Sequence, residues 1–184
     1  MSRYAPVELL TRDHDRSTFD CGSIEQTSWL RRYALLAQEA DTARVYIACR
    51  VGGAAVAGFY ALSAGGVEPE DAPRRLAHGA GRHPIPVVIL ARLGVDVGEQ
   101  HHGLGTALLR DALLQTVSVA NRVGVRALLI HAESPAAAAF YVRFDPAFER
   151  SPTDQLHLAL LMKNIRAGIR RAQNAQRDPA ISGG

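Results

Sequence analysis

The apolar positions of the chain follow two periods, which together predict seven strands and three helices. Alternation of apolar and polar residues, or a short β-branched run, predicts strands near residues 7–10, 43–49, 54–63, 87–97, 127–130, 147–150 and 155–162. Apolar residues at helical spacing predict helices over residues 24–40, 104–123 and 136–143. The resulting order, β–α–β–β–β–α–β–α–β–β, indicates one layered α/β or α+β domain.

The segment Val87–Leu114 is central to this pattern, because it reads as a strand, a glycine-rich turn and a helix. The first turn of a helix has backbone N–H groups without a partner inside the helix, and they carry the positive end of its dipole. Glycines such as Gly103 and Gly105 let an anion approach those groups, so the turn suits a phosphate. Two glycines alone are equally compatible with a tight connection that binds nothing.

The turn carries the motif Gln100-x-x-Gly103-x-Gly105. This motif resembles the Q/R-x-x-G-x-G/A motif of the GCN5-related N-acetyltransferase (GNAT) superfamily, and it matches neither the dinucleotide fingerprint nor the P-loop. The resemblance implies a central mixed, splayed β-sheet flanked by helices, with acetyl-coenzyme A (acetyl-CoA) as cosubstrate. Its pyrophosphate would lie at this turn, and its pantetheine arm would pair with the preceding strand. The residues thereby assigned to the coenzyme are Val95, Val97, Gln100, His102, Gly103, Leu104, Gly105, Thr106 and Ser134.

A candidate catalytic tyrosine follows on the predicted helix 136–143. The pair Phe140-Tyr141 resembles the GNAT pattern in which a tyrosine reaches the sulfur of the coenzyme. An amine that attacks a thioester expels a thiolate, and a nearby phenol can protonate that thiolate as a general acid. Where the family usually has F-G-F, this chain reads FDPAF over residues 144–148, so the turn after Tyr141 is altered.

No general base stands out in the sequence. His101 and His102 lie on the phosphate turn, where a backbone role fits better than base catalysis. His131 and Glu133 end the strand before the tyrosine helix and are candidates, although polar residues are common at strand ends. An α-amine has a pKa of about 7.7–8.0, so a useful fraction is already neutral at pH 7.

Within the superfamily the chain looks most like the toxins of type II toxin–antitoxin pairs. The matching marks are Phe19-Asp20-Cys21-Gly22 before a helix with Trp29-Leu30, and Ala91-Arg92-Leu93 before the coenzyme motif. Those enzymes acetylate the α-amine of the amino acid on aminoacyl-tRNA and so stop translation. The resemblance implies a homodimer and a small ribbon-helix-helix antitoxin. Candidate contacts to the tRNA, each equally compatible with a solvated surface arginine, are Arg74, Arg75, Arg82, Arg92 and Arg143.

Composition fits a globular protein with a basic end. The chain has 184 residues, of which 47% are hydrophobic, and this content suits one globular domain. The resemblance implies that residues 1–164 form an acetyltransferase domain. Residues 165–184 predict a fraying helix and a flexible basic tail. Cys21 and Cys49 lack the spacing of a metal site, so no metal is expected. Neither a signal peptide nor a membrane span is expected, which predicts a cytoplasmic protein.

Two other functions stay open from the sequence alone. The first keeps the acetyltransferase but changes the acceptor to a small amine or a protein amine. The second is a non-catalytic module that holds coenzyme A and partners a DNA-binding antitoxin. Growth arrest relieved by an antitoxin would separate the tRNA enzyme from the first alternative, and Tyr141→Phe would separate catalysis from the second.

Overall fold

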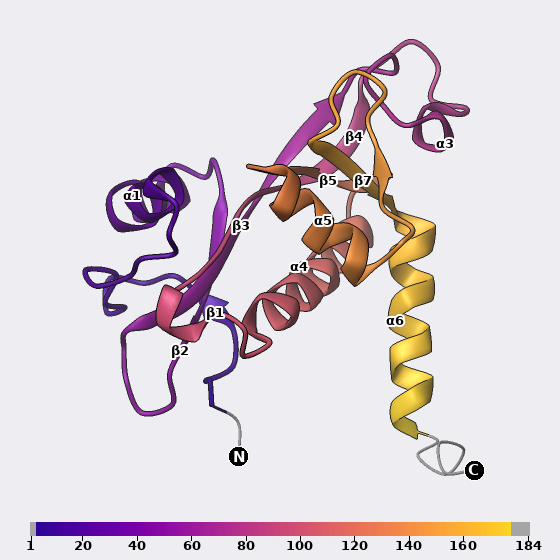
Figure 1. Cartoon of the computed structure of the whole chain (residues 1–184). Helices are drawn as coiled ribbons and strands as arrows, with labels where there is room; N and C mark the ends of the chain where they lie inside the picture. The colour runs from indigo at the N-terminus through magenta and orange to yellow at the C-terminus, as the bar shows by residue number, and fades with distance from the viewer. Residues whose placement is uncertain (1–2, 178–184) are drawn as a thin grey trace. The chain divides into compact units, whose positions relative to one another are not determined.

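A computed structural model describes residues 3–177 and contains the predicted order of strands and helices. The strands are β1 (Glu8–Leu9), β2 (Arg44–Cys49), β3 (Val56–Val67), β4 (Ile85–Val95), β5 (Ala127–His131), β6 (Glu149–Arg150) and β7 (His157–Leu161). The helices are α1 (Ile24–Arg32), α2 (Ala34–Glu39), α3 (Arg74–Ala77), the short 3-10 helix η1 (Val97–Glu99), α4 (Leu104–Ala120), α5 (Pro135–Phe144) and α6 (Met162–Arg177). The mixed α/β class predicted from the sequence is therefore confirmed (Figure 1).

The strands are ordered β1-β2-β3-β4-β5-β7-β6 in the sheet. The chain folds as two compact units, and we describe each by itself. The first unit contains the residues up to Gly65 together with Val88–Ala112, and the second contains Gly66–Val87 and the residues from Leu113 onward. The coenzyme motif belongs to the first unit, and Tyr141 belongs to the second.

The first unit is built on the antiparallel hairpin of β2 and β3, in which Val45 lies opposite Ala61. Alternate residues of both strands, with α1 and α2, enclose an apolar core. Aromatic rings fix its centre, because Trp29 stacks on Phe59 at 6.0 Å between ring centroids and Phe19 meets Phe59 edge-on at 5.5 Å. The fully buried members of this core include Leu10, Phe19, Leu30, Ala34, Val45, Ile47, Phe59 and Ala61.

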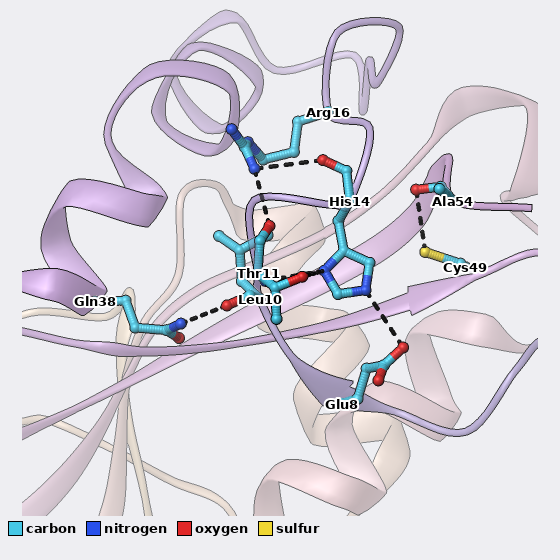
Figure 2. A network of polar contacts seen from close by, with 8 residues as sticks. All are labelled: Glu8, Leu10, Thr11, His14, Arg16, Gln38, Cys49 and Ala54. Carbon is cyan, nitrogen blue, oxygen red and sulfur yellow. Dashed lines mark hydrogen bonds and ion pairs between the residues drawn. The ribbon is translucent and has the colours of Figure 1, made fainter.

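Polar side chains fasten the segment that connects β1 to this core, as Figure 2 shows. Gln38 of α2 donates to the Leu10 carbonyl and accepts from the Val45 N–H, so one amide side chain joins the residue after β1 to β2. His14 bonds to Thr11 through Nδ1 and lies 3.3 Å from the Glu8 carboxylate through Nε2. The contacts of Gln38, and that of His14 with the Thr11 N–H, give hydrogen-bond partners to backbone groups near β1.

Several predicted boundaries differ from the observed ones, and two of the differences lie in the first unit around α1 and β4. The helix predicted over residues 24–40 is two helices, α1 and α2, separated at Tyr33, whose side chain is 53% exposed. The strand predicted to reach Val97 ends at Val95, and Val97 lies in η1. The cause is Asp96, whose carboxylate accepts a hydrogen bond from the Gly98 N–H and caps η1.

The second unit centres on the antiparallel pair β5 and β7, with Leu129 opposite Ala159. The stretch 65–84, predicted as a surface insertion with one helical turn, contains that turn as α3, but β3 extends into it as far as Val67. Leu76 of α3 is fully buried, so the insertion has an apolar anchor. Asp71 also ties it to the β6–β7 connection, where it accepts from Ser151 and Thr153.

The basic end of the chain is helical as far as the structure describes it. The fraying helix expected after Ile165 is part of α6, and the remainder of the predicted tail, residues 178–184, lies outside the described residues. Ile165 is buried, whereas the side chains from Arg170 to Ala175 are exposed. Over residues 3–177 no helix combines the length and the apolar content that a membrane span requires.

Candidate active site

The coenzyme motif forms a turn that ends in the first residues of α4. His101 and Gly103 both have positive φ angles, 63° and 82°, which fold the chain back sharply before the helix. The first hydrogen bond across the turn runs from the Ala107 N–H to the Gly103 carbonyl, at 3.1 Å. The N–H groups of Leu104, Gly105 and Thr106 thus lie at the open end of a 17-residue helix, where an anion is stabilised.

Gln100 acts within the protein rather than pointing into solvent. Its side-chain Nε2 donates to the carbonyl oxygens of Val95 and Cys21, each at 3.1 Å. The first bond joins the turn to the end of β4, and the second joins it to the Phe19-Asp20-Cys21-Gly22 segment. The two sequence motifs, almost eighty residues apart, are therefore parts of one local structure.

Asp96 strengthens the same connection. Its Oδ2 accepts from the Asp20 N–H at 3.0 Å, and the Val97 N–H donates to the Asp20 carbonyl at 2.7 Å. Asp20 in turn accepts from the Gly22 N–H through Oδ1, and Gly22 has a φ of 84°. Sequence reasoning assigned no role to Asp96, although an Asp two residues before a glycine is a common turn signal.

Glu99, next to Gln100, is the most buried charged side chain of this region. It is 1% exposed, and its carboxylate accepts from the Tyr4 hydroxyl at 2.7 Å and pairs with Arg3 and Arg50. The hydrogen bond from Tyr4 and the nearby arginines lower the Glu99 pKa. A glutamate in a polar stretch gives no sequence signal of burial, so this residue was missed.

Close packing also fixes the start of α4 against β3. A methyl group on Gly58 would lie 2.8 Å from Cδ1 of Leu108 and 3.0 Å from Cδ2 of Leu104, so the helix rests directly on the strand backbone. The buried Tyr60 donates a hydrogen bond to the Asp111 carboxylate from the same face. Leu104, a predicted coenzyme residue, is 3% exposed and can offer a ligand only its backbone.

Tyr141 is 7% exposed on α5 and lies between two aromatic rings. Phe140 meets it edge-on at 5.2 Å, and Phe148 lies 6.0 Å away. Its hydroxyl makes no hydrogen bond to any residue between 3 and 177, which leaves the O–H for a ligand. Burial, with a smaller contribution from Glu133, raises the Tyr141 pKa far above its usual value of 10, so the phenol stays protonated.

The altered turn after Tyr141 is well ordered by hydrogen bonds. Asp145 ends α5 by donating its N–H to the Tyr141 carbonyl at 3.1 Å, and its Oδ1 accepts from Ala147 at 2.9 Å. The Phe148 N–H then bonds to the Asp145 carbonyl, which returns Phe148 to the tyrosine ring. The FDPAF segment, which stands where the family has F-G-F, therefore places the aromatic ring of Phe148 beside Tyr141.

Ser134 begins the same helix. Its hydroxyl accepts from the Ala137 N–H at 3.1 Å, an N-cap bond, and Pro135 occupies the first helical position. This capping role leaves the Ser134 hydroxyl hydrogen available as a donor.

Of the two candidate bases, His131 lies against a second histidine. Its ring stacks on that of His157 at 3.9 Å between centroids, and His157 lies 3.4 Å from the Asp154 carboxylate. Burial and the neighbouring His157 lower the His131 pKa, so the ring is neutral at pH 7. The second candidate, Glu133, lies near enough to Tyr141 for its charge to raise the Tyr141 pKa.

The candidate tRNA-binding arginines fall into two groups. Arg92, in the first unit, pairs with Glu25 at 2.6 Å and lies over the Trp29 ring at 5.5 Å, so it is held by helix α1. Arg75 pairs with Glu149 at 3.5 Å in the second unit. Arg74, Arg82 and Arg143 are exposed and form no ion pair with a residue that the structure describes.

The remaining sequence predictions concern a metal site and the two histidines of the turn. Over the described range, no group of three or more His, Cys, Asp or Glu side chains could hold a metal ion. His101 and His102 are both exposed on the phosphate turn.

Comparison with known proteins identifies the family. No protein-family model matches the chain. The tRNA-acetylating toxin of Mycobacterium tuberculosis is 44% identical over 169 residues, which cover 92% of this chain and 99% of that protein. The structure of AtaT complexed with acetyl-methionyl-tRNAfMet matches with a TM-score of 0.81 and 26% identity over 89% of this chain and 98% of that one. A tyrosine-to-phenylalanine mutant of AtaT bound to the C-terminus of the antitoxin AtaR and to acetyl-CoA matches with a TM-score of 0.76 and 26% identity, over 91% and 99% of the two chains. The chain therefore belongs to the tRNA-acetylating toxins, acetyl-CoA-dependent N-acetyltransferases with the GNAT fold.

Proposed function

We propose that this chain transfers the acetyl group of acetyl-CoA to the α-amine of the amino acid on aminoacyl-tRNA, and so blocks translation. The observation that carries the proposal is the near full-length relationship to the tRNA-acetylating toxin of Mycobacterium tuberculosis. The AtaT structures, with an acetylated aminoacyl-tRNA and with acetyl-CoA, support the same acceptor and the same donor.

The first unit would hold the coenzyme. The free N–H groups at the start of α4 are the donors for its pyrophosphate, with Gly103 allowing close approach and His102 beside them. The backbone at Val95 would pair with the pantetheine arm, and Val97, in η1 rather than in β4, would contact it from the adjoining turn. Gln100 and Asp96 would keep this turn in place through their bonds to the Asp20–Cys21 segment.

The second unit would supply the acid. The neutral α-amine attacks the thioester carbonyl carbon, a C–N bond forms, and the C–S bond breaks with its electron pair leaving on sulfur. Tyr141 gives its proton to that sulfur, and the phenolate regains a proton from the nitrogen, directly or through solvent. One proton thus moves from nitrogen to sulfur overall. The raised Tyr141 pKa keeps the phenol protonated before each turnover, which a general acid requires.

Partners follow from the same family. We propose a ribbon-helix-helix antitoxin as the neutralising protein, a homodimer as the working form, and the cytoplasm, where aminoacyl-tRNA is found, as the location. Arg74, Arg82 and Arg143 would contact tRNA phosphates from the second unit, because they are exposed and unpaired within residues 3–177. Arg92 and Arg75 already have carboxylate partners, so their part would be smaller.

A cell-free translation reaction tests the proposal. Protein synthesis should stop when the chain and acetyl-CoA are both added, and should continue when either is omitted or when Tyr141→Phe replaces the wild type. If synthesis continues with wild-type protein and acetyl-CoA, while acetyl transfer to a small amine or a protein amine is detected, then the acceptor is not aminoacyl-tRNA.

A further inference from the structure

Helix α6 carries its charges in a single line. The 16 residues from Met162 to Arg177 include five cations and no acidic residue. With 3.6 residues per turn, four of the five fall within about 60° of the helix circumference. These four, which we call the basic stripe, are Lys163, Arg166, Arg170 and Arg177.

The stripe is accessible and keeps its charge. Lys163, Arg170 and Arg177 are exposed, and Arg166 is half-buried with one hydrogen bond to the neutral Asn121 side chain at 3.2 Å. No cation of the stripe forms an ion pair with a residue in the described range 3–177. The fifth cation, Arg171, lies about 110° from the centre of the stripe. Arg171 also differs from the stripe in having a carboxylate nearby, because its guanidinium and the Asp145 carboxylate both lie beside Gly168.

The apolar residues of α6 are too few to enter a membrane. Met162 and Ile165 are buried within the protein, and beyond Ile169 the helix offers only Ala172 and Ala175 as apolar side chains. A membrane-surface helix needs large apolar residues along its whole length. A line of cations on an exposed helix with a small apolar side instead complements a nucleic acid backbone.

From this arrangement we infer that the basic stripe of α6 binds the phosphate backbone of the double-helical acceptor stem of the tRNA, independently of its base sequence. Lys163 and Arg177 are about 21 Å apart along the helix, so the stripe can meet several consecutive phosphates. Arginine suits such contacts, since its planar donors match a phosphate. The inference rests on the proposed aminoacyl-tRNA acceptor and adds the surface that would hold the part of the tRNA away from the amino acid.

A pair of neighbouring single variants provides the sharpest test. Arg170→Gln and Arg171→Gln change the same residue type, on the same exposed helix, one position apart. Binding of deacylated tRNA should be measured from low to moderate salt for both. Arg170→Gln should reduce the slope of log affinity against log salt by about one, and Arg171→Gln should leave it near the wild-type value. Equal slopes for both variants would overturn the inference.

A triple variant sets the size of the effect. Lys163→Gln with Arg170→Gln and Arg177→Gln should raise the KM for full-length aminoacyl-tRNA at least tenfold at 150 mM salt, with kcat changed less than twofold. Its acetylation of an aminoacylated CCA trinucleotide, which lacks the stem, should match the wild type. Acetyl-CoA affinity and the far-ultraviolet circular dichroism spectrum, measured alongside, report whether the variant is folded.

The outcomes separate this inference from the proposed function. If the wild type acetylates aminoacyl-tRNA and the triple variant keeps its KM and salt slope, the α6 surface is wrong and the function stands. If the wild type acetylates no aminoacyl-tRNA, the function fails, and the deacylated-tRNA slopes still decide the surface. Loss of antitoxin binding with tRNA affinity retained would assign the stripe to the protein partner and overturn the inference.

Discussion

The side chain of Gln100 donates a hydrogen bond to the Cys21 carbonyl at 3.1 Å, and this bond joins the coenzyme turn to the Phe19-Asp20-Cys21-Gly22 segment. A second bond, to the Val95 carbonyl, fixes the turn to the end of β4. The motif glutamine is thus a positioning residue: it holds the backbone that would receive the pyrophosphate.

Gln100→Ala should weaken acetyl-CoA binding more than catalysis. The variant loses two hydrogen bonds, worth about 1 kcal/mol each, that fix the turn to Val95 and Cys21. We expect the Kd for acetyl-CoA, measured by calorimetry, to rise about tenfold, with kcat at saturating coenzyme nearly unchanged. Gln155→Ala, at an exposed position of the second unit, is the control and should bind normally. An unchanged Kd for Gln100→Ala would show that the turn holds its shape without that side chain.

Gly58→Ala should displace the start of α4 on the side where the helix packs against β3. The added methyl group meets Leu108, Leu104 and the Gly94 carbonyl, the last at 3.3 Å, so the helix must move away from β3. Overpacking of this kind costs about 1–3 kcal/mol of unfolding free energy. Urea denaturation and acetyl-CoA binding should both be impaired. In Gly53→Ala the nearest atom is the Arg50 carbonyl oxygen at 3.9 Å, and both measurements should match the wild type.

Tyr141→Phe should lower kcat about 10²- to 10⁴-fold, because the acid is lost while the ring still packs between Phe140 and Phe148. Acetyl-CoA affinity should remain within twofold of the wild type. The wild-type enzyme should show no fall in kcat as pH rises to 10, because the Tyr141 pKa is raised and the proton is retained. A loss of activity around pH 8 that disappears in Tyr141→Phe would contradict this assignment.

Glu99→Gln should change how stability depends on pH. The folded-state pKa of Glu99 lies below its ordinary value of 4.5, so its stabilising contribution is fully present above that value and is lost as pH falls through the folded pKa. We therefore expect a lower free energy of unfolding for Glu99→Gln at pH 7, by about 2 kcal/mol, with the gap closing in acid. Parallel curves for the two proteins from pH 7 to pH 3 would show that Glu99 titrates alike in both states.

The sequence pattern predicted what is local and missed what depends on distant partners. The alternation of β5 and β7 depends on neighbouring residues, and both strands were predicted. The helix α5 was also predicted, but Ser134 was assigned to the coenzyme and its role as the N-cap of that helix was not predicted. Val97 continues the alternation of β4, yet it leaves the strand because Asp96 bonds to Gly98 and to the distant Asp20.

The same limit applies to the site. The glycines and Gln100 were found through a motif, whereas the burial of Glu99 depends on Arg3, Tyr4 and Arg50, which no spacing rule connects to it. Tyr33 likewise continues a helical face in sequence, but it is exposed at the junction of α1 and α2.

Mass spectrometry of the aminoacyl groups on tRNA tests the central claim most directly. A pool of charged tRNAs would be incubated with the protein and isotopically labelled acetyl-CoA, with Tyr141→Phe in parallel. The account predicts a labelled acetyl group on the α-amine of one or a few amino acids, strongly reduced in the variant. Unlabelled aminoacyl groups, in a reaction where the wild-type protein binds acetyl-CoA, would contradict it.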